Sequence, residues 1–354
     1  MAYKQDAPFA VQVELCEGCN LYCNFCGLQG IRTAKDKTFK ELSIANAWSI
    51  ARQVRDAGWN PRIEFAMHGE PTMNDNYIEI VRSFRKFLPR VQLMMTSNGG
   101  GLLRPPGVVE SLNKLFDAGL NIFAFDAYEY VKIKDKVDAA LGVLCGMCNK
   151  HHEHDAPRCD VKSNIIGVCF DYHRYPDEKE FSPHNRYGHK ARKFIRIADI
   201  SVASTGTHST LNNHCGNGSA PLDEPLSARC AKPFRELAIR YNGNVAVCCN
   251  DWQGIYKCGN ILTDGLEEVW HGVAMGAARK FLIRGERSSL SPCDVCDAKS
   301  YRVGLLPDKF GKETLQRPTS NDKAIVRQAT AGRPYAKPVI PAYQLEQEKK
   351  DANT

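Results

Sequence analysis

Three closely spaced cysteines near the amino terminus constrain this 354-residue chain more than any other feature. Cys19, Cys23 and Cys26 follow the spacing C-x3-C-x2-C on a single loop. Thiolates are the soft ligands that iron–sulfur clusters require, and three of them can hold three corners of a cubic 4Fe–4S cluster. The loop offers no fourth cysteine at this spacing, so one iron would stay open to a ligand that is not protein.

A zinc site is the main alternative for the same cysteines. Zinc takes four ligands, which often come as paired C-x2-C hooks, and Cys16 can supply the fourth. The C-x3-C spacing between Cys19 and Cys23 is unusual for such a hook. The spacing therefore favours a cluster over zinc.

Composition predicts a globular protein without a membrane span. The chain is 43% hydrophobic, which is enough for one large core and a smaller one, so we expect two domains. No stretch approaches the 18 apolar residues of a membrane span, and the first residues lack a signal peptide's apolar segment. We therefore expect a cytoplasmic protein with no membrane partner, in which the fifteen cysteines indicate metal binding or catalysis rather than disulfides. The net charge of +7 is too mild to predict nucleic-acid binding by itself.

Strand-like and helix-like segments alternate through the first half of the chain. We expect strands at Phe9–Leu15, Arg62–Met67, Val91–Thr96, Asn121–Asp126, Val161–Phe170 and Phe194–Ile200, and helices at Ser43–Ala57, Tyr77–Phe87 and Val108–Ala118. Such strand–helix repeats indicate an α/β fold with a parallel sheet and right-handed crossovers. Periodicity alone does not distinguish an open doubly wound sheet from a barrel.

The cysteine loop resembles the signature of the radical S-adenosylmethionine (SAM) enzymes, including the aromatic Phe25 directly before the last cysteine. The resemblance implies a partial, TIM-like (β/α)6 barrel with functional loops at the C-terminal ends of its strands. It also implies that SAM binds the open iron and yields a 5′-deoxyadenosyl radical, which takes a hydrogen atom from a substrate. On this basis Cys19, Cys23 and Cys26 are the catalytic cluster ligands.

Two further turns follow the second and third expected strands. The run His68-Gly69-Glu70-Pro71 resembles the family's glycine–glycine–glutamate motif, with His68 in place of the first glycine. The resemblance implies that this turn binds the methionine amino group of SAM, which a carboxylate can receive. The next turn resembles the family's ribose-binding segment, and without the resemblance each reads as an ordinary turn. The expected SAM contacts are Phe25, His68, Gly69, Glu70, Pro71, Ser97 and Asn98.

Residues 213–310 resemble the SPASM/twitch extension that follows many radical SAM barrels and binds an auxiliary 4Fe–4S cluster. The resemblance assigns its ligands as Cys230, Cys248, Cys293 and Cys296. Cys248 is chosen over Cys249 because the family's ligand falls five residues after the turn glycine, here Gly243. One cysteine before the turn and one closing pair imply a single auxiliary cluster, as in twitch domains. From the residues alone a four-cysteine zinc ribbon stays open.

We divide the chain into a radical SAM barrel at 1–212, a twitch/SPASM domain at 213–310 and a tail at 311–354. The composition of the tail predicts an extended or disordered segment, or an arm that lies on a partner. A third group of potential zinc ligands, or an insertion loop with adventitious thiols, comprises Cys145, Cys148, His151, His154 and Cys159. The remaining thiols are read as small buried residues: Cys16, Cys169, Cys215 and Cys258.

The resemblance predicts an oxidoreductase-type or maturase-type enzyme that uses SAM, the SAM-binding cluster and the auxiliary cluster, with a reductase such as flavodoxin or ferredoxin as electron donor. A peptide or protein side chain ranks first as substrate. A nucleoside, nucleotide or DNA base ranks second, followed by a sugar-like metabolite, and a non-catalytic iron–sulfur or zinc protein ranks last. Some protein-oxidising members carry a carboxylate base directly after the turn cysteine. Cys249 occupies that place here, which puts the dehydrogenase subtype in doubt.

Overall fold

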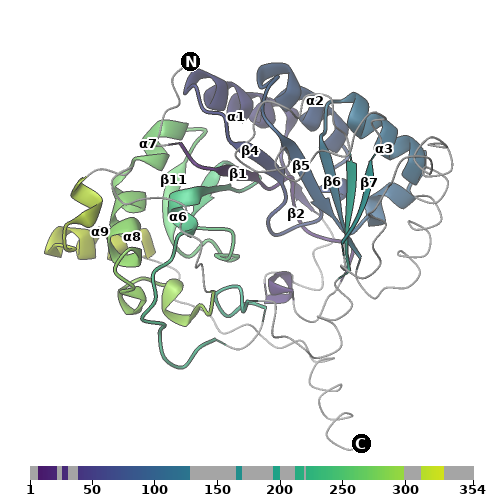
Figure 1. The fold of residues 1–354 in the computed structure, drawn as a ribbon. Helices are drawn as coiled ribbons and strands as arrows, with labels where there is room; N and C mark the ends of the chain where they lie inside the picture. The colour runs from purple at the N-terminus through teal and green to yellow at the C-terminus, as the bar shows by residue number, and fades with distance from the viewer. Residues whose placement is uncertain are drawn as a thin grey trace, which may run out of the picture.

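The computed structural model describes residues 7–21, 26–30, 39–127, 165–169, 194–199, 212–218, 221–298 and 312–330. A nine-stranded sheet with the order β11-β10-β9-β1-β4-β5-β6-β8-β7 forms its centre. Helices α1, α2 and α3 lie along the outer side of this sheet, and the C-terminal elements extend it at the opposite end (Figure 1).

The first part of the sheet is built from repeated strand–helix units. Its elements are β1 (Ala10–Val13), α1 (Ile44–Asp56), β4 (Arg62–Phe65), α2 (Tyr77–Phe87), β5 (Leu93–Ser97), α3 (Val108–Asp117) and β6 (Ile122–Ala127). Neighbouring strands in this series pair in parallel. The α/β fold with a parallel sheet is therefore confirmed.

Helix α1 shows how the sequence sets these units. Ser43 caps its start by accepting a hydrogen bond of 3.2 Å from the Asn46 N–H, which satisfies one of the free donors of the first turn. Its buried face, which includes Ile50 and Val54, packs against the sheet. Gly58 ends the helix with a φ of 68°, a conformation that glycine adopts without strain.

The fifth and sixth expected strands are present as β7 (Ile165–Cys169) and β8 (Phe194–Asp199). Strand β8 pairs in parallel with β6, as a barrel strand should. Strand β7 instead lies at the sheet edge and runs antiparallel to β8. The prediction of six parallel strands is therefore wrong for β7. A short apolar run predicts a strand but does not encode its direction.

The C-terminal region continues the same sheet. Its elements are α6 (Lys232–Arg235), β9 (Glu236–Ile239), β10 (Asn244–Ala246), β11 (Lys257–Asn260), α7 (Leu266–Trp270) and α8 (Val273–Leu282). Strand β9 pairs in parallel with β1, and β10 and β11 follow in antiparallel order. Trp270 is fully buried and packs edge-on against Trp59, so the two regions share one apolar core.

Short elements complete the described part of the chain. They are β2 (Cys16–Glu17), β3 (Lys40–Glu41) and the 3-10 turns η1 (Gly27–Gly30), η2 (Pro71–Met73), η3 (Gly100–Leu103), η7 (Arg287–Ser289), η8 (Cys293–Val295) and η10 (Lys312–Leu315). No helix among the described residues is long and apolar enough to cross a bilayer.

The prediction of an extended tail is wrong for part of this segment, which forms the helix α9 (Ser320–Thr330). Thr319 and Asp322 form a reciprocal cap at the start of this helix, and buried Val326 joins the main core. Lys280 of α8 also pairs with Asp322 at 2.9 Å. The cap and the apolar face outweigh a composition that is otherwise typical of disorder. Residue 311 and residues 331–354 of the tail lie outside the described residues.

Candidate active site

The loops that follow β1, β4 and β5 meet at one end of the sheet. Parallel strands place their carboxyl ends at the same edge, so residues far apart in the sequence come together there. Cys19, the Gly69–Glu70 turn and Asn98 belong to these three loops. The contacts between them define the candidate site.

Gly69 brings the second loop against the first. A side chain at this position would place its Cβ 1.7 Å from the carbonyl oxygen of Cys16, so only glycine fits. The N–H of Glu70 then donates a hydrogen bond of 2.7 Å to the carbonyl of Gly18, one residue before Cys19. The turn is therefore fixed directly beside the cysteine loop.

Glu70 is buried and accepts hydrogen bonds from four protein donors. Its Oε1 accepts from the N–H and hydroxyl of Thr72 and from the Ser97 hydroxyl at 2.6 Å, and its Oε2 accepts from the Asn98 N–H at 2.8 Å. Burial raises the pKa of Glu70, and these donors oppose the rise. The carboxylate thus holds the second and third loops together, and Oε2 keeps room for one more donor.

Asn98 connects the third loop to the cysteine loop. Its Nδ2 lies 3.3 Å from Sγ of Cys19 and 3.0 Å from Oδ1 of Asn20. The Leu21 N–H also donates to the Cys19 sulfur at 3.3 Å. Both Cys19 and Cys26 are partly exposed, as ligands to a group outside the protein core should be. Cys23 and Phe25 lie outside the described residues.

Pro71 and His68 flank the Gly69–Glu70 turn and have different environments. Pro71 starts the 3-10 turn η2 and is buried. The His68 side chain is buried too, and it contacts the C-terminal region rather than the cysteine loop. The predicted SAM contacts that the structure describes therefore share one neighbourhood, and their roles in SAM binding stay predictions.

The four predicted auxiliary ligands lie in the C-terminal region and are all buried thiols outside disulfides: Cys230, Cys248, Cys293 and Cys296. Cys230 precedes α6, Cys248 follows β10, and the closing pair lies on and directly after η8. Burial, reinforced by neighbouring thiols, raises the pKa of Cys248 and of Cys293. Thiols from three separate segments therefore lie close enough to influence one another.

Backbone N–H groups point at three of these sulfurs in a repeated pattern. At Cys230, Cys248 and Cys296, the donor is the backbone N–H two residues further along the chain. The hydrogen bonds to Cys248 and Cys296 measure 3.4 Å. Hydrogen bonds to cysteine sulfurs are a feature of iron–sulfur sites and tune their potentials. The thiols thus fit a 4Fe–4S cluster. Within the described part of the chain, no three His, Cys, Asp or Glu side chains are grouped to hold a single metal ion.

The sequence analysis missed the environment of Cys215. This thiol is fully buried and donates a hydrogen bond to Cys296, which lowers the pKa of Cys296 to about 6. His214 and Cys215 both have positive φ values, 46° and 55°, which turn the chain toward the other thiols. No motif marks this turn, because left-handed backbone at non-glycine residues has no strong sequence signal.

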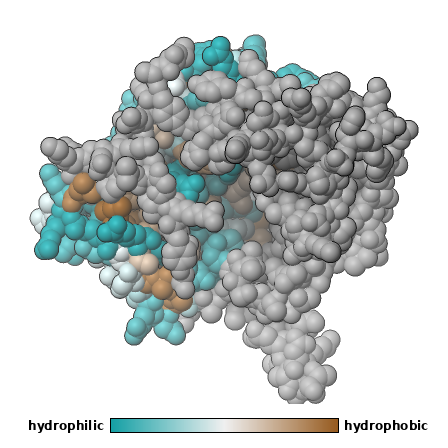
Figure 2. Space-filling model, viewed as in Figure 1, coloured by the Kyte–Doolittle hydropathy of each residue, from teal (hydrophilic) through white to brown (hydrophobic). Residues whose placement is uncertain are grey.

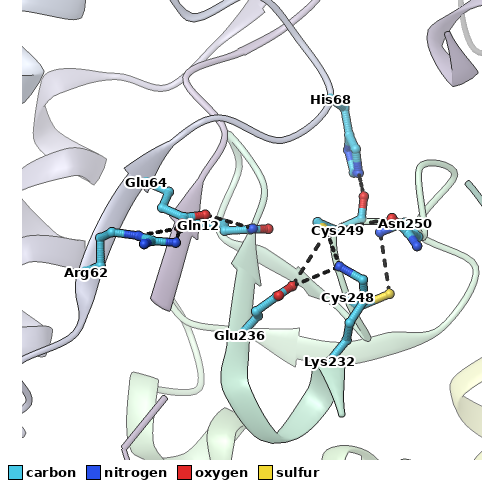
Figure 3. A network of polar contacts seen from close by, with 9 residues as sticks. All are labelled: Gln12, Arg62, Glu64, His68, Lys232, Glu236, Cys248, Cys249 and Asn250. Carbon is cyan, nitrogen blue, oxygen red and sulfur yellow. Dashed lines mark hydrogen bonds and ion pairs between the residues drawn. The ribbon is translucent and has the colours of Figure 1, made fainter. Parts of the chain in front are cut away.

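Cys249 belongs to a different environment from Cys248. Its sulfur lies 3.2 Å from Nζ of Lys232 and 3.6 Å from Oε2 of Glu236 (Figure 3). Burial raises the pKa of Cys249 to about 11, and Lys232 opposes this rise. The adjacent cysteines therefore face apart, one toward the thiols and one toward an ion pair.

Polar side chains continue along the inner face of the sheet. Gln12 of β1 donates a hydrogen bond of 3.0 Å to Glu64 of β4, which also pairs with Arg62 (Figure 3). Glu236 of β9 lies on the same face, because its register partner Ala10 is two residues from Gln12. Hydrophilic residues are also visible at the base of the hollow in the space-filling view (Figure 2). The inner face is thus lined with charges and amides.

The third group of potential zinc ligands, which runs from Cys145 to Cys159, lies outside the described residues. Cys16 and Cys258 are among the thiols that the sequence predicts to be small buried residues, and both are buried. Burial raises the pKa of both thiols.

Two family models match separate parts of the chain. The radical SAM superfamily matches residues 13–131, and the SPASM iron–sulfur cluster-binding domain matches residues 230–297. The first range contains the three loops of the candidate site, and the second begins at Cys230 and contains the other predicted auxiliary ligands.

One curated relative and two solved structures are similar over most of their length. The S-adenosyl-L-methionine-dependent 2-deoxy-scyllo-inosamine dehydrogenase of Niallia circulans is 21% identical over 293 residues, covering 83% of this chain and 94% of that protein. The crystal structure of BtrN in complex with AdoMet and 2-DOIA is 20% identical, with a TM-score of 0.56, and covers 82% of this chain and 94% of that one. A BtrN structure in an open conformation is 17% identical, with a TM-score of 0.50, and covers 82% and 93%. The chain is therefore a radical SAM enzyme with a C-terminal SPASM-type domain, and its cofactors are SAM, a SAM-binding 4Fe–4S cluster and an auxiliary iron–sulfur cluster.

Proposed function

We propose that this enzyme oxidises a hydroxyl-bearing carbon of a small, polar, sugar-like substrate to a carbonyl. When bound, SAM and its cluster would supply the radical chemistry that removes one hydrogen atom from the substrate carbon, and the auxiliary cluster would accept the remaining electron. The hydroxyl proton leaves to a base, so that the product lacks two hydrogen atoms. The observation that supports this proposal most directly is the contact between the Cys19 sulfur and the side-chain amide of Asn98. The backbone N–H of Asn98 also donates a hydrogen bond to Glu70.

The chain's own residues would divide the work as follows. Cys19, Cys23 and Cys26 would hold the SAM-binding cluster. Glu70 would orient the loop of Asn98 and offer Oε2 to the methionine ammonium of SAM, since that oxygen accepts one hydrogen bond, from the Asn98 N–H, and has a further lone pair. The auxiliary ligands would be Cys230, Cys248, Cys293 and Cys296.

The inner face of the sheet supports a polar substrate. Gln12 Oε1 is buried and has no hydrogen-bond partner among the described residues. A buried acceptor without a donor costs free energy, roughly 1–3 kcal/mol, which a substrate hydroxyl or ammonium would recover. Glu64 and Glu236 on the same face add carboxylates of the kind that bind amino and hydroxyl groups.

The name of the curated relative favours the same substrate class. That protein is a dehydrogenase of 2-deoxy-scyllo-inosamine, a hydroxylated ring with an amine. A peptide side chain, which ranked first in the sequence analysis, and a nucleotide stay as competing candidates. A flavodoxin or ferredoxin would supply the reducing electron in each case.

The test uses anaerobically reconstituted full-length protein with SAM, dithionite and 2-deoxy-scyllo-inosamine as probe. We expect 5′-deoxyadenosine to form faster with the probe and the product to lack two hydrogens. Deuterium at the oxidised carbon should appear in 5′-deoxyadenosine. A serine- and cysteine-containing peptide and a nucleoside serve as comparators. Stimulation by either comparator and not by the cyclitol would reject the substrate class, and tightly bound zinc without iron would reject the radical chemistry.

A further inference from the structure

His68 joins two parts of the molecule that bind different groups under the proposed function. It follows β4 and lies directly before Gly69, so its backbone belongs to the turn beside the cysteine loop. Its side chain points to the C-terminal region, where Nε2 lies 3.0 Å from the carbonyl oxygen of Cys249 (Figure 3). Cys249 directly follows Cys248, which is a predicted ligand of the auxiliary cluster.

The imidazole is held on three sides. Its Nδ1 lies 3.2 Å from Oε1 of Glu14, at the end of β1, and neither side chain has any exposed surface. Its ring packs on Trp252 with a centroid distance of 4.8 Å and an interplanar angle of 36°. Trp252 lies four residues after Cys248, so a second contact joins His68 to the same loop. The side chain therefore has no freedom to move independently of either region.

The two ring nitrogens of His68 face oxygens from different segments. Nε2 faces the Cys249 carbonyl, and Nδ1 faces the Glu14 carboxylate. Burial alone would raise the pKa of Glu14, but His68 and Arg240 outweigh burial and lower it. His68 therefore connects Glu14, which follows β1, to the loop that follows β10.

His68 belongs to a buried polar set that joins four segments. Arg240 Nε lies 3.6 Å from Oε2 of Glu14, and burial raises the pKa of Asp251 while nearby His68 and Arg240 oppose this rise. These four side chains come from the residues that follow β1, β4 and β9 and from the loop after β10. A buried set of this kind fixes how its segments are arranged, because moving one group leaves another buried without its partner.

The backbone beside His68 is strained. Met67 has a φ of 107°, which is unfavourable for any residue with a side chain. Strain of this type persists where the surrounding contacts over-determine it. Here the strained residue directs the next side chain toward Cys249.

We propose that His68 is a positioning residue that couples SAM binding at the Gly69–Glu70 turn to the auxiliary-cluster site at Cys248. The inference rests on the proposed function for the identity of the two sites. A turn that shifts when SAM binds would move His68, and His68 would move the peptide that follows Cys248. Coupling of this kind is reciprocal, so each site must respond to occupancy of the other.

The test compares the holoenzyme with His68→Gly and His68→Gln. Glycine is the residue that the family's motif has at this place, and glutamine keeps an N–H donor for the Cys249 carbonyl but loses the second ring nitrogen, which faces Glu14. His214→Gln is the matched control, because His214 also packs on Trp252, at 5.0 Å, from another segment. The readouts are iron content, the dissociation constant of SAM, and the EPR spectrum of the reduced auxiliary cluster with and without SAM.

We expect SAM to change the auxiliary-cluster spectrum of the unmodified enzyme. In His68→Gly this response should be lost and the SAM dissociation constant should rise about tenfold, within the usual range of coupling between sites. His68→Gln should fall between the two, and His214→Gln should bind SAM as the unmodified enzyme does. A merely structural role would lower iron content or thermal stability and leave the SAM response intact.

Two outcomes would overturn the coupling. One is an auxiliary-cluster spectrum that does not respond to SAM in the unmodified enzyme, a measurement that needs no variant. The other is a response that survives unchanged in His68→Gln and His68→Gly. Neither outcome touches the proposed function, which fails separately if the unmodified enzyme lacks iron or does not cleave SAM.

Discussion

The side-chain amide of Asn98 lies 3.3 Å from the sulfur of Cys19, so the loop after β5 donates directly to a thiol that we assign to the SAM-binding cluster. A donor stabilises the more negative, reduced state of a cluster. Removing it in Asn98→Ala should therefore make the potential of that cluster more negative. A net hydrogen bond of roughly 0.5–1.5 kcal/mol corresponds to about 20–60 mV for one electron.

An EPR-monitored redox titration of the SAM-binding cluster measures this shift. Ser97→Ala is a suitable comparison, because the Ser97 hydroxyl lies in the same loop but donates to Glu70 rather than to a cysteine sulfur. An unchanged or more positive potential in Asn98→Ala would contradict the assignment of Cys19 as a ligand beside this donor.

Glu70 should matter for stability as well as for SAM. Glu70→Ala leaves buried donors of Thr72, Ser97 and Asn98 without an acceptor, at about 1–3 kcal/mol for each unsatisfied group. We expect a large fall in the free energy of unfolding and loss of SAM binding. Glu70→Gln keeps one acceptor oxygen and should be intermediate on both measures. Chemical denaturation and equilibrium dialysis with SAM check these outcomes, and a fully stable Glu70→Ala protein would contradict them.

Gln12 should affect substrate binding without affecting SAM. Its buried Oε1 lacks a protein partner among the described residues, so we expect it to accept from the substrate. Gln12→Met is similar in length and should raise the substrate KM roughly tenfold, since a lost hydrogen bond of about 1.4 kcal/mol has that effect. The dissociation constant of SAM should not change. A parallel loss of SAM binding would show that Gln12 acts on the fold and not on the substrate.

The sequence predicted the elements of the fold better than their directions. The helical spacing of apolar residues between Tyr77 and Phe87 identified α2, and a short apolar run identified β7 without revealing that this strand runs antiparallel. Helix α9 was missed because proline-rich composition was given more weight than the cap formed by Thr319 and Asp322. Local periodicity therefore fixes which residues form an element, whereas pairing and docking depend on tertiary contacts.

The candidate site was predicted as loops but not as contacts. The order of strands and motifs placed Cys19, Glu70 and Asn98 at one edge of the sheet, as the structure confirms. No spacing rule could show that Ser97 donates to Glu70, or that Cys215 lies beside Cys296. These contacts depend on side-chain geometry and on backbone with positive φ, which a motif does not encode.

Acid should weaken the attachment of α9. Burial alone would raise the pKa of Asp322, but hydrogen bonds from Lys280 and Thr319 outweigh it and lower the pKa. A lowered pKa means that the stabilisation is present above the ordinary value near 4 and is lost as pH falls through the folded-state value. The protection of the α9 amides, measured as exchange relative to the intrinsic rate at each pH, should therefore fall below about pH 4. Asp322→Asn should show lower protection at neutral pH and little further loss in acid.

The adjacent cysteines after β10 should differ sharply in iron binding. The Cys248 sulfur accepts the Asn250 N–H and lies near the other predicted ligands, whereas the Cys249 sulfur contacts Lys232. Under anaerobic reconstitution, two 4Fe–4S clusters give about eight irons per chain. Cys248→Ala should retain about four and should still cleave SAM slowly, because the SAM-binding cluster is held by other cysteines, but it should form no product. Cys249→Ala should keep all of its iron. If iron analysis gives the reverse pattern, the ligand assignment in this loop is displaced by one residue, and the contacts of Cys249 with Lys232 must then break when the cluster binds.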